Sequence, residues 1–446
     1  PSSTAVRFYG PGTVLEIAGH VLESPMVYHV AGTLRDPFDA SLIEAGLPVA
    51  KPDRGYVGEL PYWPTYRGAS PEQRQQYLAW LTSGRCRTDV AISYPFIYFY
   101  GLERRVLIDG CDHEAILQEV LRLLPIYQSN NSFRRYASTF LWTIVMTAIG
   151  RVSLSPDMLR LAITSTSFWN EENLSVLLAN YQANGHPLPP EVALLVADHD
   201  PRAPRSIVIR RHHERFTELF IRRYVGRFGD GMVLRAGKNP RRYSYTPASA
   251  TLRHEFAGGR TSQLTLPNTL GLSSQFKPLI EIWSSAIEDL KHFDKAHRKS
   301  SSETMTAAMY ESLPQELRCE DHPDFEAWYS AINRHVDKDG WSLVPVGDLA
   351  SIRGISERTR LTKTQCEDLL KCADSMDLAV EPDARMTGQN YRWDEVVSVF
   401  PREDELNLHD KSYHAASILL RLGMSVAAAD GNIDESEVST ITMHLE

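Results

Sequence analysis

The sequence GASPEQRQQYLAWLTSGR, residues 68–85, carries a complete set of local signals for a helix. Ser70 can cap its first turn, Pro71 suits the first helical position, and Gln73 completes a capping box. Gly84 suits the left-handed conformation that ends many helices. We therefore predict a helix between Ser70 and Gly84.

The regions on both sides of this helix indicate the fold class. Residues 6–34 alternate short apolar runs with Gly and Pro, which is typical of two or three strands joined by turns. From residue 85 to about 196, apolar residues recur mainly at helical spacing. We predict a mostly α protein with a small N-terminal β-sheet and minor β elements, an α+β chain of several helical domains.

Length and composition set limits on the class of protein. The chain has 446 residues, enough for two to four domains, and a net charge of −9. Its five cysteines form no C-x-x-C pair, which favours reduced thiols over a disulfide framework or zinc cluster. The most apolar run, residues 136–150, is shorter than the about 20 residues that span a bilayer. With no signal peptide recognised at the start, we predict a cytoplasmic protein without membrane contact.

The segment 201–242 differs sharply in charge from the rest of the chain. It holds eleven arginines and one lysine against three acidic residues, a net charge of +9. On a helix, Arg211, Arg215 and Arg222 would project within about 40° of one another and could face phosphates. Alternatively, Glu218 pairs with Arg222, or the segment docks on acidic parts of the chain. The candidate residues for binding a nucleic acid or a partner are Arg211, Arg215, Arg222, Arg223, Arg227, Arg241 and Arg242.

Motifs of common enzyme classes are missing from the sequence. It contains neither a G-x-S-x-G elbow nor an H-E-x-x-H helix. In GMVLRAGKN, five residues instead of four separate Gly231 from Gly237, and Asn239 replaces the Ser or Thr of a phosphate loop. These departures argue against an ATPase, and we predict no catalytic residues and no enzyme.

Two passages resemble the TerB-N module that precedes TerB domains in bacterial proteins. They are LPYWPTYRGASPEQRQQYLAWLTSGR, residues 60–85, and YPFIYFYGLERRVL, residues 94–107, and the resemblance extends over roughly residues 5–280. The signature residues that we single out are Trp63, Tyr66, Trp80, Tyr100, Gly101, Glu103, Arg104 and Arg105. In so apolar a helix we expect Glu103 to pair with an arginine in a buried charge network. A functional cluster at Glu103–Arg105 is the alternative.

The sequence SVAAADGNIDESEVST, residues 425–440, resembles the opening acidic turn of a TerB domain, of which only the start is present. An EF-hand is excluded because Val426 and Ala428 would occupy its first two ligand positions. Helix capping by Asp434 and Glu437 explains the turn without any metal. The resemblance instead implies that Asp430, Asp434 and Glu437 help to hold Ca²⁺ or Mg²⁺, with further ligands from later helices. We therefore expect metal in an intact TerB domain and none in this chain.

The proposed organisation has three parts. Residues 1–280 form the TerB-N module, residues 281–400 a middle helical region, and residues 401–446 the truncated start of the TerB domain. Within the middle region, residues 361–400 could form a winged-helix-like unit, whose acidic wing suits protein docking better than DNA.

The resemblance also implies a function. TerB-type proteins suggest a non-catalytic scaffold or sensor of a bacterial stress-response or phage-defence system related to tellurite resistance. Its partners would be other proteins of such a complex. The alternative is a nucleic-acid-binding accessory subunit that contacts DNA or RNA through residues 202–242. A metal-dependent hydrolase is disfavoured because no His, Ser or Cys constellation supports it.

Overall fold

The computed structural model describes residues 5–36, 38–52, 60–257, 264–299, 305–318, 322–336 and 342–402, together with Ser439. The chain divides into two compact units, each made of two segments. Unit 1 comprises Pro1–Arg202 and Tyr224–Glu281, and unit 2 comprises Ala203–Arg223 and Ile282–Glu446. Helices α9 (His213–Phe228) and α11 (Lys277–Lys299) contribute residues to both units.

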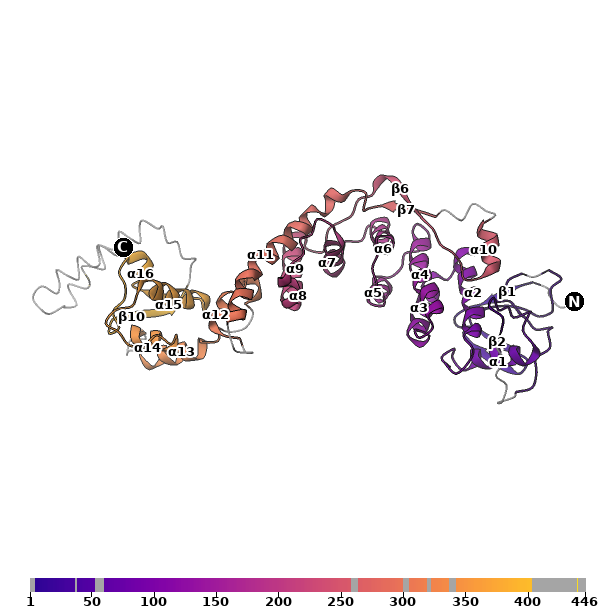
Figure 1. Ribbon diagram of the computed structural model, residues 1–446, viewed down its shortest axis with the longest axis horizontal. Helices are drawn as coiled ribbons and strands as arrows, with labels where there is room; N and C mark the ends of the chain where they lie inside the picture. The colour runs from indigo at the N-terminus through magenta and orange to yellow at the C-terminus, as the bar shows by residue number, and fades with distance from the viewer. Residues whose placement is uncertain are drawn as a thin grey trace, which may run out of the picture. The chain divides into compact units, whose positions relative to one another are not determined.

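Unit 1 begins with short strands and continues as a series of helices (Figure 1). Its strands are β1 (Arg7–Tyr9), β2 (Val14–Ile17), β3 (His20–Glu23), β4 (Val27–Val30), β5 (Ile43–Glu44), β6 (Gly237–Tyr243) and β7 (Leu264–Asn268). Its helices are α1 (Pro71–Thr82), α2 (Ser93–Leu107), α3 (His113–Ile126), α4 (Asn131–Ala148), α5 (Pro156–Thr164), α6 (Glu171–Ala183), α7 (Pro190–His199) and α10 (Ala250–Ala257), with a 3₁₀ turn η1 (Ser273–Phe276).

The strands of unit 1 form small sheets against the first helices. β4 pairs antiparallel with β1 and parallel with β5, while β2 and β3 form a hairpin. β6 and β7 pair antiparallel with a register irregularity after Gly237. The mostly helical fold class with a small N-terminal sheet is confirmed.

The predicted first helix is confirmed in detail. Ser70 accepts from the backbone N–H of Gln73, and the Gln73 side chain accepts from the backbone N–H of Ser70, which completes the capping box. Pro71 opens α1, and Gly84 follows its end with a φ of +75°. These local contacts explain why a short stretch of sequence is enough to specify α1.

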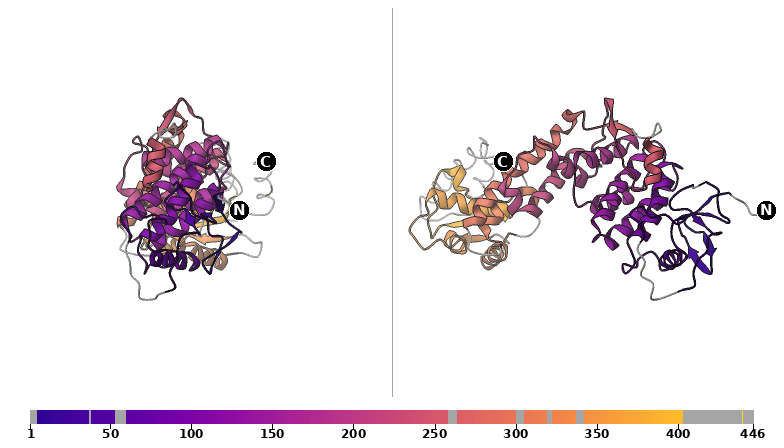
Figure 2. Two further views of the ribbon diagram at one scale, coloured as in Figure 1. Left: turned by 90° about the vertical axis from the view of Figure 1, so that its right-hand side faces the viewer. Right: turned by 45° about the vertical axis from the view of Figure 1, so that its right-hand side comes forward.

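Aromatic side chains fill the core where α2 and α4 meet. Phe99 of α2 lies with its ring centroid 5.5 Å from that of Phe133 and 5.3 Å from that of Phe140, both on α4. α4 also packs against α3 and α6, and the three helices lie close together in Figure 1, in the purple and magenta part of the chain that Figure 2 shows from two further sides. α4 holds most of the apolar run 136–150, which confirms that run as a core helix. In the described residues no helix has the length and apolar character to cross a membrane.

Unit 2 combines helices with one three-stranded sheet. Its helices are α8 (Ile207–Arg211), α12 (Ala307–Glu311), α13 (Phe325–Arg334), α14 (Val346–Ile352), α15 (Lys363–Ser375) and α16 (Ala384–Thr387), with a 3₁₀ turn η2 (Gln315–Leu317). Its strands β8 (Leu343–Pro345), β9 (Leu378–Glu381) and β10 (Val396–Pro401) form an antiparallel sheet in the order β8-β10-β9.

The sheet of unit 2 shares one hydrophobic core with α13, α14 and α15, around the fully buried Trp328. Along the chain, these elements follow one another in the order α13, β8, α14, α15, β9, α16 and β10. The helix and two strands predicted within residues 361–400 are α15, β9 and β10, and the shared core extends back to Phe325. The domain boundaries of the sequence analysis stay predictions.

Candidate functional site

The arginine segment contributes to α8, α9 and β6, and all of its candidate arginines except Arg242 contact acidic or aromatic side chains. Arg211 and Arg215 do not share one helix, because α8 ends at Arg211 and α9 begins at His213. Between the two helices, the backbone of His212 leaves the helical conformation. The His212 imidazole lies 3.1 Å from an Asp294 carboxylate oxygen. A continuous stripe of Arg211, Arg215 and Arg222 on one helix is therefore wrong.

Five of the seven candidate arginines form ion pairs, each with a residue of the same unit. The nitrogen-to-oxygen distances are 3.3 Å for Arg211–Asp294, 2.7 Å for Arg222–Glu218, 2.7 Å for Arg223–Asp289, 2.9 Å for Arg223–Glu316, 3.0 Å for Arg227–Glu281 and 2.6 Å for Arg241–Glu171. The guanidinium carbon of Arg215 lies 4.8 Å from the ring centroid of Phe293. Arg242 is exposed. The pairs that are exposed on both sides, Arg222–Glu218 and Arg227–Glu281, contribute less than about 1 kcal/mol each, so they indicate complementary charge rather than strong stabilisation.

Part of the TerB-N signature forms the core of unit 1. Tyr66 and Trp80 are fully buried, and the Trp80 indole donates to the Tyr127 hydroxyl at 2.8 Å. Gly101 packs so closely that a Cβ atom there would lie 3.0 Å from the Ser41 hydroxyl oxygen. These residues serve to pack α1 and α2 into the core.

Glu103 is fully buried, but no arginine in the described part of the chain pairs with it. It accepts hydrogen bonds from the Tyr245 hydroxyl and from the backbone N–H groups of Ala248, at 2.8 Å, and Ser249, at 3.2 Å. Burial raises the pKa of Glu103 from 4.5 to about 7, and the three hydrogen bonds act in the opposite direction. The prediction of a Glu103–arginine pair is wrong.

The two arginines after Glu103 have other partners, since successive helical side chains point in different directions. Arg104 lies 3.2 Å from Glu255 and 3.6 Å from the buried Asp39. Arg105 contacts Asp112 at 2.7 Å and Asp109 at 2.9 Å. All three signature residues therefore join α2 to neighbouring segments.

The rest of the signature lines an aromatic pocket in unit 1. The pocket has a volume of about 350 Å³. Its lining comes from the segment before α1, the N-terminal halves of α2 and α4, and the segment before α10, namely Leu60, Pro61, Tyr62, Trp63, Pro64, Ala91, Ile92, Ser93, Phe96, Tyr100, Asn130, Ser132, Tyr136 and Ala248. No charged side chain is among these described lining residues.

The rings of this pocket are accessible and set at steep angles to one another. Tyr62 is 82 % exposed and Trp63 is 53 % exposed, and their rings meet edge to face at 5.2 Å. Phe96 meets Tyr136 in the same manner at 6.2 Å. Trp63 and Tyr100 are the signature residues at this site. The sequence analysis singled them out but did not predict that they share a pocket.

A family model of the TerB N-terminal domain matches residues 10–208. The chain therefore contains a TerB N-terminal domain. This family is related to tellurite resistance. No curated protein and no solved structure matches the chain significantly. The match is shorter than the resemblance over residues 5–280, yet residues 224–281 lie in the same compact unit as the TerB N-terminal domain.

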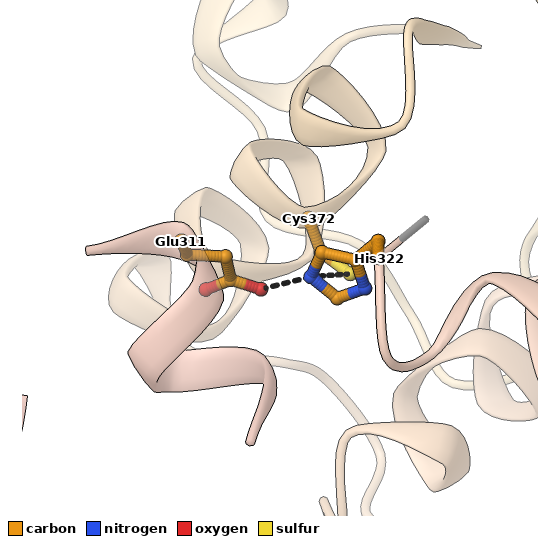
Figure 3. Close-up of side chains that lie close together, drawn as sticks. All are labelled: Glu311, His322 and Cys372. Carbon is orange, nitrogen blue, oxygen red and sulfur yellow. Dashed lines mark hydrogen bonds and ion pairs between the residues drawn. The ribbon is translucent and has the colours of Figure 1, made fainter. Parts of the chain in front are cut away.

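Outside the TerB N-terminal domain, unit 2 holds a buried cluster of Glu311, His322 and Cys372 (Figure 3). His322 Nε2 lies 3.0 Å from a Glu311 carboxylate oxygen and 3.9 Å from the Cys372 sulfur. One candidate ligand atom of each residue lies within 4.8 Å of the others, close enough to consider a metal site. No sequence motif marks this cluster, because its three residues are far apart in the chain.

The hydrogen bonding of His322 does not fit a metal ligand or a catalytic base. The backbone N–H of Asp324 donates to Nδ1 at 3.0 Å, so in neutral His322 the proton sits on Nε2 and points to Glu311. A metal on Nε2 would require the opposite tautomer. Nε2 is also the nitrogen that faces Cys372. Because Nε2 carries the proton, it has no lone pair to accept the proton of the Cys372 thiol.

The charges around the cluster lead to the same conclusion. A guanidinium nitrogen of Arg353 lies 2.8 Å from Glu311, where it would repel a bound cation. Burial raises the pKa of Cys372, which keeps the thiol protonated. The cluster therefore serves as a hydrogen-bonded link between α12, α15 and the segment before α13.

The acidic-turn residues Asp430, Asp434 and Glu437 lie outside the described residues. The metal site that the resemblance implies for them stays a prediction.

Proposed function

We propose that this protein is a non-catalytic binding module, a scaffold or sensor in a bacterial stress-response or phage-defence system related to tellurite resistance. The observation that carries the proposal is the aromatic pocket of the TerB N-terminal domain. Accessible tyrosine and tryptophan rings supply large contact areas at low entropic cost, and such residues dominate protein interfaces.

The same pocket is poorly suited to catalysis. Its described lining has no charged side chain, histidine or cysteine, so its tyrosine and serine hydroxyls have no such group beside them in the lining to activate them. The other cluster of reactive residues, around His322, has the wrong tautomer for proton transfer to Cys372. A binding role agrees with both observations. A cytoplasmic location stays a prediction of the sequence.

The proposal is tested by capture of partners from bacterial cells, with and without phage challenge or tellurite. The full chain and a Tyr62→Ser, Trp63→Ser double variant are immobilised and compared, with nuclease-treated samples in parallel. We expect the full chain to retain specific proteins after nuclease treatment and the double variant to lose them. Equal capture by both would overturn the role of the pocket.

A nucleic-acid-binding role is the second candidate, and β6 favours it. Lys238 and Arg242 on this strand are exposed, and within the described residues neither has an acidic partner. Binding to phosphates would weaken steeply with salt because counterions are released. Fluorescence polarisation at low salt, with Lys238 and Arg242 replaced by Glu, tests this role. Absence of DNA and RNA binding by the unmodified chain would end it.

A further inference from the structure

Three polar groups of the aromatic pocket offer hydrogens rather than lone pairs. The indole Nε1 of Trp63 can only donate. The Asn130 carbonyl oxygen already accepts from the Phe133 N–H at 2.9 Å, so the side-chain NH₂ group remains available. The Tyr136 oxygen accepts from Arg253 at 2.7 Å, which leaves its hydroxyl hydrogen free to donate. A well-matched ligand therefore brings hydrogen-bond acceptors.

Two helix N-termini reinforce this preference. Ser93 is the first residue of α2 and Ser132 lies in the first turn of α4, and both line the pocket. The backbone N–H of Tyr94 already donates to the Ala91 carbonyl and that of Phe133 to Asn130, so Ser93 and Ser132 carry the N–H groups that these helix starts, with their partial positive charge, can still offer. Carbonyl oxygens are favoured there, and the N–H groups of a ligand would find few acceptors.

The lining also limits the charge of the ligand. No charged side chain is available among the described lining residues to neutralise a phosphate, carboxylate or ammonium group. Burying such a group without a partner is costly. The rings of Tyr62, Trp63, Phe96 and Tyr136 instead favour flat, apolar groups that pack against their faces.

We propose that this pocket binds a proline-rich segment of a partner protein in the polyproline II conformation. Proline has a flat apolar ring and no backbone N–H, so such a segment presents carbonyl acceptors and few donors. Aromatic grooves recognise prolines in this way in unrelated domains. The inference rests on the proposed function as a protein-binding module and assigns the chemistry of its partner.

The test uses the full chain and a blocked, fluorescein-labelled decaproline peptide, followed by fluorescence polarisation. A blocked Gly-Ser peptide of equal length is the control ligand. We expect the chain to bind decaproline and not the Gly-Ser peptide. Trp63→Phe keeps a ring and removes the donor, so its affinity should fall about 3- to 10-fold. Tyr62→Ala with Trp63→Ala should weaken binding at least about 30-fold.

Tyr329→Ala provides the matched control, because Tyr329 is an exposed aromatic residue on α13 in unit 2. It should bind decaproline as the unmodified chain does. Absence of decaproline binding up to about 1 mM, or equal affinity of Trp63→Phe, would overturn the inference. The proposed function would survive a failure to bind decaproline if the Tyr62→Ser, Trp63→Ser variant still loses the proteins that the full chain captures. If neither peptide nor protein capture depends on these residues, both proposals fall.

Discussion

Glu103 is the residue at which burial and hydrogen bonding oppose each other most directly. Its carboxyl group faces three donors, which favour the ionised form, but it has no solvent contact and no cationic partner within hydrogen-bonding distance among the described residues. Burial is the larger effect and raises its pKa to about 7. The contact joins α2 to the segment before α10, so the protonation of one residue affects how that segment is held.

Replacement of Glu103 by Gln tests this balance through the pH dependence of stability. The folded pKa of about 7 lies above the ordinary 4.5, so folding takes up a proton between these values. The contribution of Glu103 to the unfolding free energy is therefore complete below pH 4.5. It falls as the pH rises from 4.5 to 7 and is constant above pH 7. The total change is about 3 kcal/mol. Urea unfolding of both proteins from pH 5 to 8 should show their difference in unfolding free energy shrinking by that order.

Other titrating groups are common to both proteins and cancel in this difference. A difference that stays constant over the pH range would mean that Glu103 remains ionised when folded. Its three donors would then outweigh burial.

At the scale of elements, α9 brings together arginines with very different surroundings. Arg223 is 17 % exposed and contacts Asp289, Glu316 and the Ser285 hydroxyl. Arg222, one residue earlier, is 43 % exposed and pairs with Glu218 one turn away on the same helix. Arg223 therefore joins α9 to α11 and η2, whereas the Arg222–Glu218 pair lies within α9.

Alanine at each of these two positions provides a matched comparison. Arg223→Ala leaves two carboxylates without their cation, and we expect the unfolding free energy to fall by about 1–3 kcal/mol. Arg222→Ala should lower it by less than about 1 kcal/mol, since an exposed ion pair within one helix contributes little. Urea unfolding followed by tryptophan fluorescence measures both, because Trp283 and Trp328 are buried in unit 2. Equal losses would show that the interelement contacts of Arg223 do not stabilise unit 2.

Local signals explain what could be predicted from the sequence and what could not. The capping box of α1 involves residues three positions apart, so the sequence alone predicts it. Tyr245 is far from Glu103 in the chain, and no pattern marks the two as partners. The pocket likewise draws its lining from four separate segments. Helices were therefore predictable from the sequence, whereas the contacts between them required the structure.

At the scale of the whole molecule, the limits of the sequence family differ from those of the folded unit. The family match ends at residue 208, but unit 1 also includes Tyr224–Glu281 with β6, β7 and α10. Glu103 lies inside the match and its partners Tyr245, Ala248 and Ser249 lie beyond it. A protein cut at the end of the match would leave the Glu103 carboxyl group without its partners, so the match alone does not define the folded domain.

The acidic turn raises the last question at this scale. Asp430, Asp434, Glu435 and Glu437 lie within eight positions, where their charges repel one another. Oxygen ligands of this kind suit Ca²⁺ or Mg²⁺, and the resemblance to TerB domains implies further ligands from later helices. We propose that a chain continuing through a complete TerB domain binds one of these cations. Residues 1–446 alone should bind it weakly or not at all.

Calorimetric titration of both lengths with Ca²⁺ and Mg²⁺ separates the alternatives. In the longer chain, Asp430→Asn with Asp434→Asn should abolish the heat of binding, because two of the proposed ligands lose their charge. Equally tight binding by residues 1–446 would refute the need for later helices. If the longer chain binds neither cation, Asp434 and Glu437 act as helix caps, which stabilise by about 1 kcal/mol without a metal.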